Sequence, residues 1–293
     1  MNLLLILALL SIVLWAVEPA VKRWSDPKRG ADKLQRALRE IYAAHHDLVE
    51  VRWNDFPHLD LAFYDSTAKT FAEHGFRILG DLEDRTVSGK VLARRTFIRC
   101  LTDDAGVGVG IYNFQLAGWA RWVVPFMRNL RIVDIGSEFS DGTFLNTSNA
   151  WHARHVKLPP EIDTVFHRLD TLPHVLLQAH HERRDAYLSQ HPGVTPIVIS
   201  AVQDEIASGQ RSSRLKAAFR AQSKYQMTRD ELRAHAGDMW LPGTAKAAED
   251  LADAIDGAAS SRPSRPGRRL AYQVFGWMLL VVIFAVAYRW TAH

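Results

Sequence analysis

Cysteine is nearly absent from this sequence: Cys100 is the one cysteine in 293 residues. A single cysteine excludes an internal disulfide bond and agrees either with a reducing compartment or with a fold that needs no disulfide. Cys100 lies within a predicted strand, with neither a helix start nor a histidine beside it. We therefore do not expect it to be a reactive thiol.

The sequence also lacks the signatures of several common enzyme classes. It contains no P-loop, no kinase signature and no G-x-S-x-G nucleophile motif. Gly106, Gly108 and Gly110 resemble the start of a dinucleotide-binding fingerprint. That fingerprint needs a small residue at position 111, which is Ile111, and a helix after it. We expect no cofactor.

Positive charge is not concentrated where a nucleic-acid-binding domain would need it. The chain has a formal charge of +4, but residues 30–261 hold 27 basic and 30 acidic residues. This central region therefore has a net charge of about −3 with histidine neutral. A nucleic-acid-binding module concentrates positive charge on the domain itself. We expect no nucleic-acid partner.

The two longest hydrophobic runs lie at the ends of the chain. A secretory signal peptide would carry basic residues before its apolar run, whereas here they follow the first run. We therefore expect a retained N-terminal transmembrane helix within residues 1–20. The second run has the length of a membrane span and predicts a C-terminal transmembrane helix within 270–290. Between them we expect a domain over 30–258 and a Pro, Ser and Arg linker over 259–269.

Basic residues next to these two segments predict the orientation of the chain. They form two clusters, one after the first segment and one before the second: Lys22, Arg23, Lys28, Arg29, Arg262, Arg265, Arg268 and Arg269. The positive-inside rule puts both clusters on the cytoplasmic side, together with the domain between them. We expect a two-pass protein of a bacterial-type inner membrane, with both termini outside. The clusters would then face the anionic headgroups of the lipid bilayer.

Residues 94–149 predict the centre of the fold. Segments rich in β-branched and aromatic residues alternate there with turn signals, among them Asp103–Gly106 and Ser140–Gly142. We expect an α+β fold in which helices flank an antiparallel β-meander of four to five strands, between the two transmembrane helices. Alternate glycines from Gly106 to Gly110 would let a helix or a bulky ring approach one face of the sheet closely.

Apolar periodicity predicts helices on both sides of this sheet. Before the sheet we expect helices over 31–51 and 61–74, with Gly75 ending the second and a strand beginning at Phe76. After the sheet we expect helices over 162–169, from Pro173, and over 198–208, 211–225 and 245–255. Thr228 and Glu231 have the spacing of a capping box, which predicts another helix start.

An aromatic segment, residues 116–127, lies between the third and fourth predicted strands and is too short to span a bilayer. Its rings and the flanking arginines are suited to the headgroup layer: Trp119, Trp122, Phe126, Arg128 and Arg131. The alternative is that this segment covers the core or widens a hairpin.

Histidine is the most abundant candidate for chemistry, with 13 in the chain. A weak candidate for a metal-dependent catalytic site consists of His152, His155, His180, His181 and Glu182. Adjacent histidines on a helix point about 100° apart, and Asp185 stands where the zincin helix motif needs its second histidine. We therefore expect no metal and treat these residues mainly as core or solvated histidines.

Two further segments suggest binding. The hairpin from Ser137 to Asn149 is rich in hydrogen-bonding groups that suit either a polar ligand or the turn itself. A basic helix suits either an anionic membrane or acidic partner, or a solvated surface. Its cations are Arg211, Arg214, Lys216, Arg220 and Lys224.

These patterns indicate a membrane-anchored protein with a cytoplasm-facing interaction or regulatory domain. We expect a non-catalytic role and a protein partner, bound through the sheet face, the aromatic segment or the basic helix. One alternative is a membrane-bound metal-dependent hydrolase that uses the histidines and Glu182. The other is a sheet domain that binds lipid or a small ligand.

Overall fold

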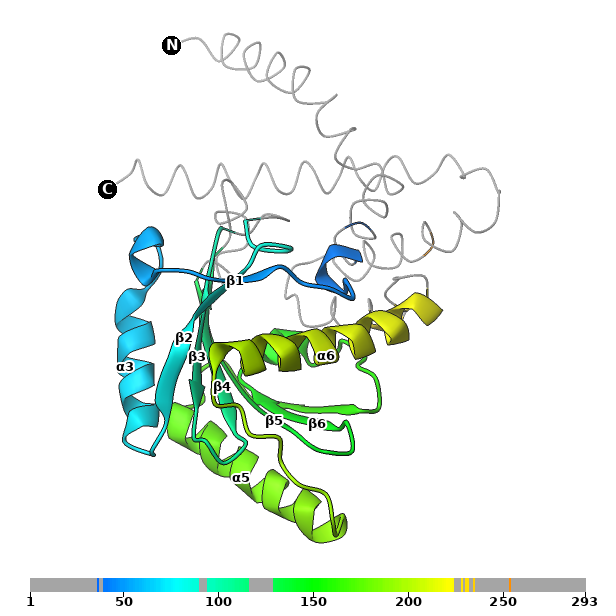
Figure 1. Ribbon diagram of the computed structural model, residues 1–293. Coiled ribbons are helices and arrows are strands. Elements are labelled where there is room, and N and C mark those ends of the chain that lie inside the picture. Colours follow the sequence, from blue (N-terminus) through cyan, green and yellow to red (C-terminus); the bar gives the residue numbers. More distant parts are fainter. Residues whose placement is uncertain are drawn as a thin grey trace, which may run out of the picture. The chain divides into compact units, whose positions relative to one another are not determined.

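The computed structural model describes residues 39–89, 94–115 and 129–223, and the single positions 36, 228, 230, 231, 234 and 253. The chain divides into two units, Ala37–Met227 and a second unit of residues 1–36 and 228–293. The first unit is the domain shown in colour in Figure 1. Its elements are β1 (Leu48–Glu50), η1 (Trp53–Asp55), α3 (Leu61–Ala72), β2 (Arg77–Asp84), β3 (Ile98–Thr102), β4 (Gly108–Phe114), β5 (Leu130–Glu138), β6 (Phe144–Ser148), η3 (Trp151–Ala153), β7 (Ile162–Phe166), α5 (Pro173–Gln190) and α6 (Val202–Gln222).

A seven-stranded sheet forms the centre of the described domain, with its strands in sequence order from β1 to β7. Each pair from β1 to β6 is antiparallel, whereas β7 is parallel to β6. The expected α+β fold with a largely antiparallel sheet and flanking helices is therefore confirmed. The sheet has more strands than the four to five expected, and its last pair is parallel.

Both predicted hairpin turns form where the sequence places them. In the β3–β4 turn the Asp103 carboxylate accepts hydrogen bonds from the amides of Ala105 and Val107, at 2.8 and 2.9 Å. In the β5–β6 turn Gly142 has a φ of +87°, a conformation that favours glycine. Local turn chemistry thus determines the register of these two strand pairs.

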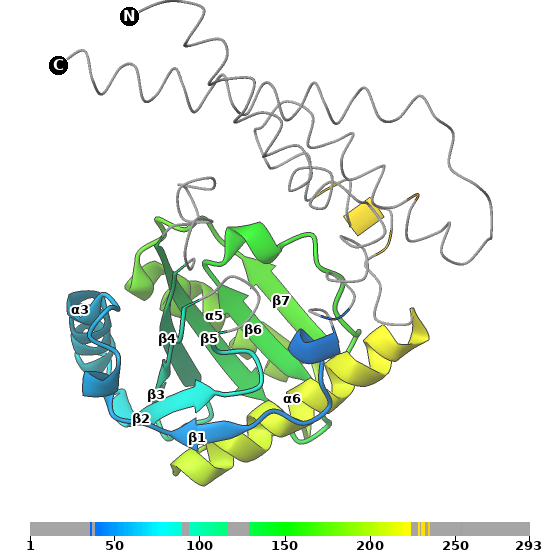
Figure 2. The same cartoon turned by 90° about the horizontal axis from the view of Figure 1, so that it is seen from above.

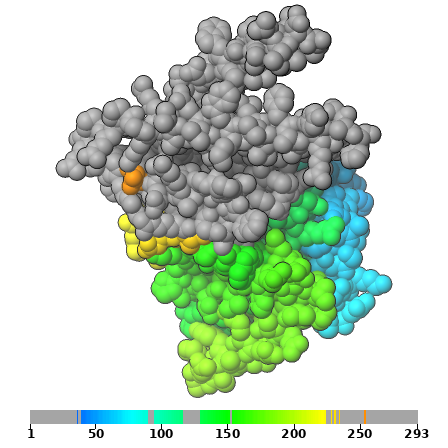
Figure 3. All heavy atoms as spheres, turned by 180° about the vertical axis from the view of Figure 1, so that it is seen from behind, coloured from blue at the N-terminus to red at the C-terminus, as the bar shows by residue number. Residues whose placement is uncertain are grey.

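Helices cover both faces of the sheet (Figure 2). Side chains of β4 alternate between these faces, so Val109 and Ile111 enter the core that α3 and α5 cover. The opposite positions are glycines, and a Cβ on Gly108 would lie 3.7 Å from the Glu205 carboxylate of α6. The expected close approach of a helix is confirmed. In the space-filling view from behind, α3 forms one flank of the domain in blue to cyan (Figure 3).

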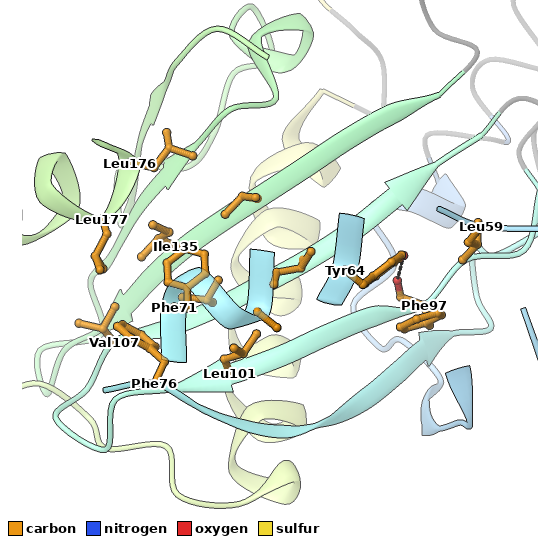
Figure 4. Close-up of a cluster of buried hydrophobic side chains, with 14 of the residues drawn as sticks. Leu59, Tyr64, Phe71, Phe76, Phe97, Leu101, Val107, Ile135, Leu176 and Leu177 are labelled. Atoms are coloured by element: carbon orange, nitrogen blue, oxygen red, sulfur yellow. Dashed lines mark hydrogen bonds between the residues drawn. The ribbon is translucent and has the colours of Figure 1, made fainter. Parts of the chain in front are cut away.

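The main core lies between the sheet and α3 with α5, and Figure 4 shows its buried side chains. Tyr64 of α3 stacks on Phe97, with ring centroids 4.4 Å apart, and its hydroxyl donates to the Phe97 carbonyl at 2.9 Å. The amide of Asn113 donates to the same hydroxyl at 2.8 Å, so this buried tyrosine is satisfied. Each fully buried aromatic or aliphatic side chain contributes roughly 1.5–3 kcal/mol to stability.

Four of the helix predictions need correction. The helix expected over 31–51 ends at Ile41, and Leu48–Glu50 instead pairs with β2 as strand β1. The helix expected over 162–169 is strand β7. Both segments extend an existing sheet, and this tertiary pairing outweighs a helical periodicity of a few residues. In place of the two helices expected over 198–208 and 211–225, one continuous helix, α6, covers Val202–Gln222.

Other predictions for the helices are confirmed. Helix α3 covers Leu61–Ala72, and Gly75 follows it with a φ of +86°. Helix α5 begins at Pro173, as expected. In the second unit, the Thr228 amide donates to the Glu231 carboxylate at 2.7 Å, and the Glu231 amide to the Thr228 hydroxyl at 3.3 Å. These reciprocal bonds are those of a capping box.

Both predicted transmembrane segments, within 1–20 and 270–290, lie outside the described residues, as do the linker 259–269 and most of the predicted helix 245–255. Among the residues that the structure does describe, no helix has the length and hydrophobicity needed to cross a bilayer.

Candidate functional site

An open groove runs between α3 and the beginning of β2, with a volume of about 370 Å³. Its lining is mostly apolar and includes Ile78, of which 52% is exposed to solvent. The other lining residues are Asp65, Ala68, Lys69, Ala72, Phe76, Arg77, Arg99 and Leu101. An exposed isoleucine in a concave apolar surface indicates a binding site more strongly than a scattered surface residue does.

The local sequence explains why a groove forms there. Asp60 caps α3, because its carboxylate accepts a hydrogen bond from the Phe63 amide at 3.2 Å. At its other end α3 stops before Gly75, and the chain reverses into β2. Ala68 and Ala72 are four residues apart and therefore lie on one face of α3. Their short side chains leave room between the helix and Ile78.

The strand beside the groove has a free edge over part of its length. Strand β1 pairs only with residues 82–84 of β2, and the Val51 amide donates to the Asp81 carbonyl at 2.9 Å. Within the described chain, no hydrogen bond is made to the outer edge of residues 77–80. The pairing of β2 with β3 shifts between Ile78 and Gly80, so the edge is bent by a bulge. Unpaired amides and carbonyls of a strand edge readily accept a further strand.

Charged groups at the rim of the groove are largely paired with each other. Arg99 is buried and donates to Asp81 at 2.9 and 3.1 Å and to Asp65 at 2.8 Å. Arg77 donates to both carboxylate oxygens of Asp104, at 2.8 and 2.6 Å. Lys69 is exposed and forms no ion pair with any described residue. The rim therefore offers one cation to a negatively charged group on a ligand.

A polar cluster lies on the opposite face of the sheet, under α6. The Tyr112 hydroxyl donates to the Asp134 carboxylate at 2.9 Å. Burial raises the pKa of Asp134 and lowers the pKa of Lys216, which faces it from α6. Nearby, Arg211 of α6 donates to both oxygens of Glu138, at 2.5 and 2.8 Å. This cluster joins α6 to the sheet through groups that already interact with one another.

Several cations of the predicted basic helix interact with other groups of the domain. Arg211 is paired with Glu138, and Lys216 faces Asp134. Arg220 is buried and donates to the Lys157 carbonyl at 2.7 Å. Arg214 alone among the described cations of this helix is well exposed, and Lys224 lies outside the described residues. The described part of this helix therefore presents Arg214 and part of the Arg211 side chain to solvent, whereas Lys216 and Arg220 are engaged within the protein.

The described candidate histidines differ in their surroundings. His180 is fully buried on α5, where the Ser137 hydroxyl lies 3.0 Å from Nε2 and the Thr147 hydroxyl 3.2 Å from Nδ1. The side-chain amide of Gln178 donates a hydrogen bond to the Glu182 carboxylate at 2.9 Å on the exposed side of α5. His181 and His155 are partly buried, and the side chain of His152 is outside the described part. Among described residues, no group of three His, Cys, Asp or Glu side chains is arranged for a metal ion.

Polar groups of the Ser137–Asn149 hairpin are also used internally. Thr147 contacts His180 and also accepts from Arg183 at 2.9 Å. The Asn149 side chain donates to the carbonyls of Arg131 and Leu169, each at 3.2 Å. Asp141 at the turn accepts from the Tyr187 hydroxyl at 2.6 Å. These contacts attach the hairpin to α5 and to the segment after β7.

Most residues predicted to contact the membrane lie outside the described residues. These are Trp119, Trp122, Phe126, Arg128 and the eight basic residues of the two junction clusters. Arg131 is described at the beginning of β5, where it forms an ion pair with Asp60 at 2.5 Å.

The groove beside α3 was missed by the sequence analysis. The pair of small residues Ala68 and Ala72 on an otherwise amphipathic helix was the one signal available for it.

Comparison with known proteins does not assign this chain to a family. The chain matches no family model, and neither a curated protein nor a solved structure is significantly similar to it.

Proposed function

We propose that this chain is a membrane-anchored interaction protein whose central domain binds a partner through the groove between α3 and β2. The partner contributes an extended peptide segment, which pairs with the free edge of β2. The observation that carries this proposal is the position of an open apolar groove directly beside an unpaired strand edge.

This arrangement supplies both components of peptide recognition by strand addition. Main-chain groups of an edge strand provide affinity, and neighbouring pockets that receive alternate side chains provide specificity. Here the edge is residues 77–80, and the pocket is formed by Ile78, Phe76 and the short side chains of α3. A peptide with apolar residues at alternate positions fits this surface, and Lys69 favours an acidic residue near it.

The membrane location is part of the same proposal and is supported by the two apolar end segments with their basic clusters. Within the domain, the Arg220 guanidinium near the end of α6 lies 4.9 Å from the ring of Tyr42, which precedes β1. The chain thus enters and leaves the domain side by side. Two anchors in one bilayer are compatible with this arrangement. By the positive-inside rule the domain would be cytoplasmic.

The two alternative functions have weaker support. A metal-dependent hydrolase would need His180, but both of its ring nitrogens are hydrogen-bonded to hydroxyl groups in the core. A small-ligand site would use the polar cluster under α6. The groups of that cluster already bond to each other, whereas the groove is open to solvent.

The first test is selection of peptides by the full-length protein in mild detergent from a phage-displayed library of random peptides. We expect enrichment of peptides with alternating apolar residues and an acidic residue. An Ile78→Arg substitution places a charge in the apolar groove and should weaken binding of the selected peptides at least about ten-fold, or ~1.4 kcal/mol.

Val198→Arg is the matched control, because Val198 is 51% exposed and lies outside the groove lining. This variant should bind the selected peptides as the unmodified protein does. Selected peptides that bind the Ile78→Arg variant with unchanged affinity would show that the groove is not their site.

A further inference from the structure

The last strand of the sheet, β7, turns part of its main chain away from the rest of the sheet. It forms one edge of the sheet, with β6 as its neighbour (Figure 2). At one end of this ladder the Phe144 amide donates to the Glu161 carbonyl at 2.7 Å. At the other end the His167 amide donates to the Ser148 carbonyl at 2.7 Å. Alternate residues of a parallel strand bond to the same neighbour, so the odd-numbered residues of β7 face β6 and the even-numbered ones face outward.

These outward-facing groups are largely unused within the described chain. The Ile162 amide donates to the Pro159 carbonyl at 3.0 Å. The carbonyl of Ile162 and the amides and carbonyls of Thr164 and Phe166 make no hydrogen bond with any described residue. Such an edge readily pairs with another strand.

Strand β7 also lacks the features that commonly protect an edge from pairing. Proteins block exposed edges with lysine, with proline or with a β-bulge. Residues 162–166 contain neither lysine nor proline, and their pairing with β6 runs without a break in register. The one charged residue of the strand, Asp163, forms an ion pair with Arg183 of α5 at 2.9 Å. The outer edge is therefore available for a further strand.

The side chains along this edge are complementary to themselves. In an antiparallel pair of two copies centred on Thr164, the Thr164 amide of each copy donates to the Thr164 carbonyl of the other. The Phe166 amide donates to the unused Ile162 carbonyl of the second copy. The same register puts the aromatic ring of Phe166 opposite the β-branched Ile162, a favourable cross-strand combination.

The distribution of charge along the edge also favours a second copy in the antiparallel orientation. Glu161 and Asp163 are exposed at the beginning of the strand, whereas His167 and Arg168 follow its end. Antiparallel self-pairing brings the acidic beginning of one copy beside the basic end of the other, with Glu161 opposite His167. Parallel self-pairing would place like charges together. The edge thus specifies both its occupant and the direction of that occupant.

We propose that two copies of this chain associate through β7 and form one continuous sheet across a two-fold axis at Thr164. Each copy contributes the same residues, as in other isologous interfaces. The association covers Val165, of which 38% is exposed in the single chain. The peptide-binding edge of β2 lies towards the other side of the sheet and stays open. Dimerisation therefore does not depend on the proposed peptide binding.

Cross-linking of cysteine variants of the full-length protein in mild detergent tests this register. Residue 163 of one copy and residue 165 of the other form a non-hydrogen-bonded pair, with Cα atoms about 4.5 Å apart, which a disulfide can bridge. The two copies of residue 165 are diagonal neighbours about 7–8 Å apart, too far for a disulfide, and the same holds for residue 163.

An equimolar mixture of Asp163→Cys and Val165→Cys chains is oxidised with copper–phenanthroline. We expect at least about five-fold more disulfide-linked dimer from the mixture than from either variant alone, because the bond requires the two cysteines to face each other. Cys100 is buried and does not cross-link. A mixture that forms no more linked dimer than the single variants would overturn the proposed pairing.

A second measurement removes the central hydrogen bonds. Thr164→Pro deletes the outward amide without disturbing the ladder to β6, and it should raise the dimer dissociation constant at least about ten-fold in sedimentation experiments. Thr164→Val is the matched control, because both variants lose the hydroxyl that accepts from Asn146 at 3.4 Å and valine keeps the amide. Circular dichroism establishes that both variants fold. If folded Thr164→Pro protein dimerises as tightly as the control, β7 is not the interface.

Discussion

At the scale of single residues, His180 is a buried histidine whose surroundings favour the neutral imidazole. Its imidazole is fully buried between the hydroxyl groups of Ser137 and Thr147. Burial lowers its pKa to about 3, and the nearby Arg183 acts in the same direction. The folded protein therefore holds a neutral imidazole in its core, with one ring nitrogen donating and the other accepting.

This environment makes stability depend on pH. Between about pH 6.5 and about pH 3 the unfolded chain binds a proton at His180 and the folded chain does not. The unfolded state binds more protons in this window, so stability is present above pH 6.5 and is lost as the pH falls. The loss is about 1.4 kcal/mol per pH unit, or roughly 2–3 kcal/mol between pH 7 and 4.5.

We predict that His180→Leu destabilises the protein at neutral pH and removes this pH dependence. Two buried hydroxyls lose their partner at a cost of about 1–3 kcal/mol each. The difference from the unmodified protein should then shrink as the pH is lowered to about 4.5, in urea unfolding followed by circular dichroism. His174→Leu changes an exposed histidine of the same helix and is the control. A stability difference for His180→Leu that is the same at both pH values would contradict the assignment.

At the scale of elements, the segment before α6 packs closely on the β3–β4 turn. Gly106 in this turn has a φ of +97°, and a Cβ at that position would lie 2.5 Å from Pro196 Cβ. Gly75 after α3 has a similar φ of +86°, but a Cβ there would have no neighbour within 4 Å. The two glycines thus share a backbone conformation and differ in packing.

We predict that Gly106→Ala lowers the free energy of unfolding more than Gly75→Ala does. In both variants an alanine must adopt the left-handed conformation, which costs about 1–2 kcal/mol of stability. Gly106→Ala also forces Pro196 away from the turn, which adds about 1–3 kcal/mol. Thermal or urea unfolding of the two variants measures the difference. Equal losses in both variants would mean that the segment before α6 is not held against the turn.

The helices, strands and turns also show which features of the fold could be predicted from sequence patterns. The two hairpin turns, the end of α3 at Gly75 and the start of α5 at Pro173 depend on residues within a few positions, and they were predicted. Strands β1 and β7 depend on pairing with residues distant in the sequence, and they were predicted as helices. Gly209 separated two predicted helices, yet it lies within α6, where a Cβ would be 3.4 Å from Leu48.

At the scale of the whole molecule, the charge distribution along the chain predicts which side of the membrane holds the domain. The two clusters, Lys22 to Arg29 and Arg262 to Arg269, lie before and after the domain in the sequence, and in the proposed orientation the positive-inside rule would put the domain in the cytoplasm. We predict that trypsin added to intact spheroplasts leaves the domain uncut and that it is degraded after the membrane is opened. A periplasmic protein that is digested in both samples serves as the control. Cleavage of the domain in intact spheroplasts would reverse the proposed orientation.

The sequence by itself determined the α+β class with a largely antiparallel sheet, the two hairpin turns, the end of α3 before Gly75, the start of α5 at Pro173 and the Thr228–Glu231 capping box. Each of these follows from local backbone chemistry. Only the tertiary structure decided that the cations of α6 turn towards Glu138 and Asp134 and that His180 is a core residue. The same is true of the groove beside α3. These features depend on which face of a helix meets the sheet and on where an edge strand ends, and long-range packing determines both.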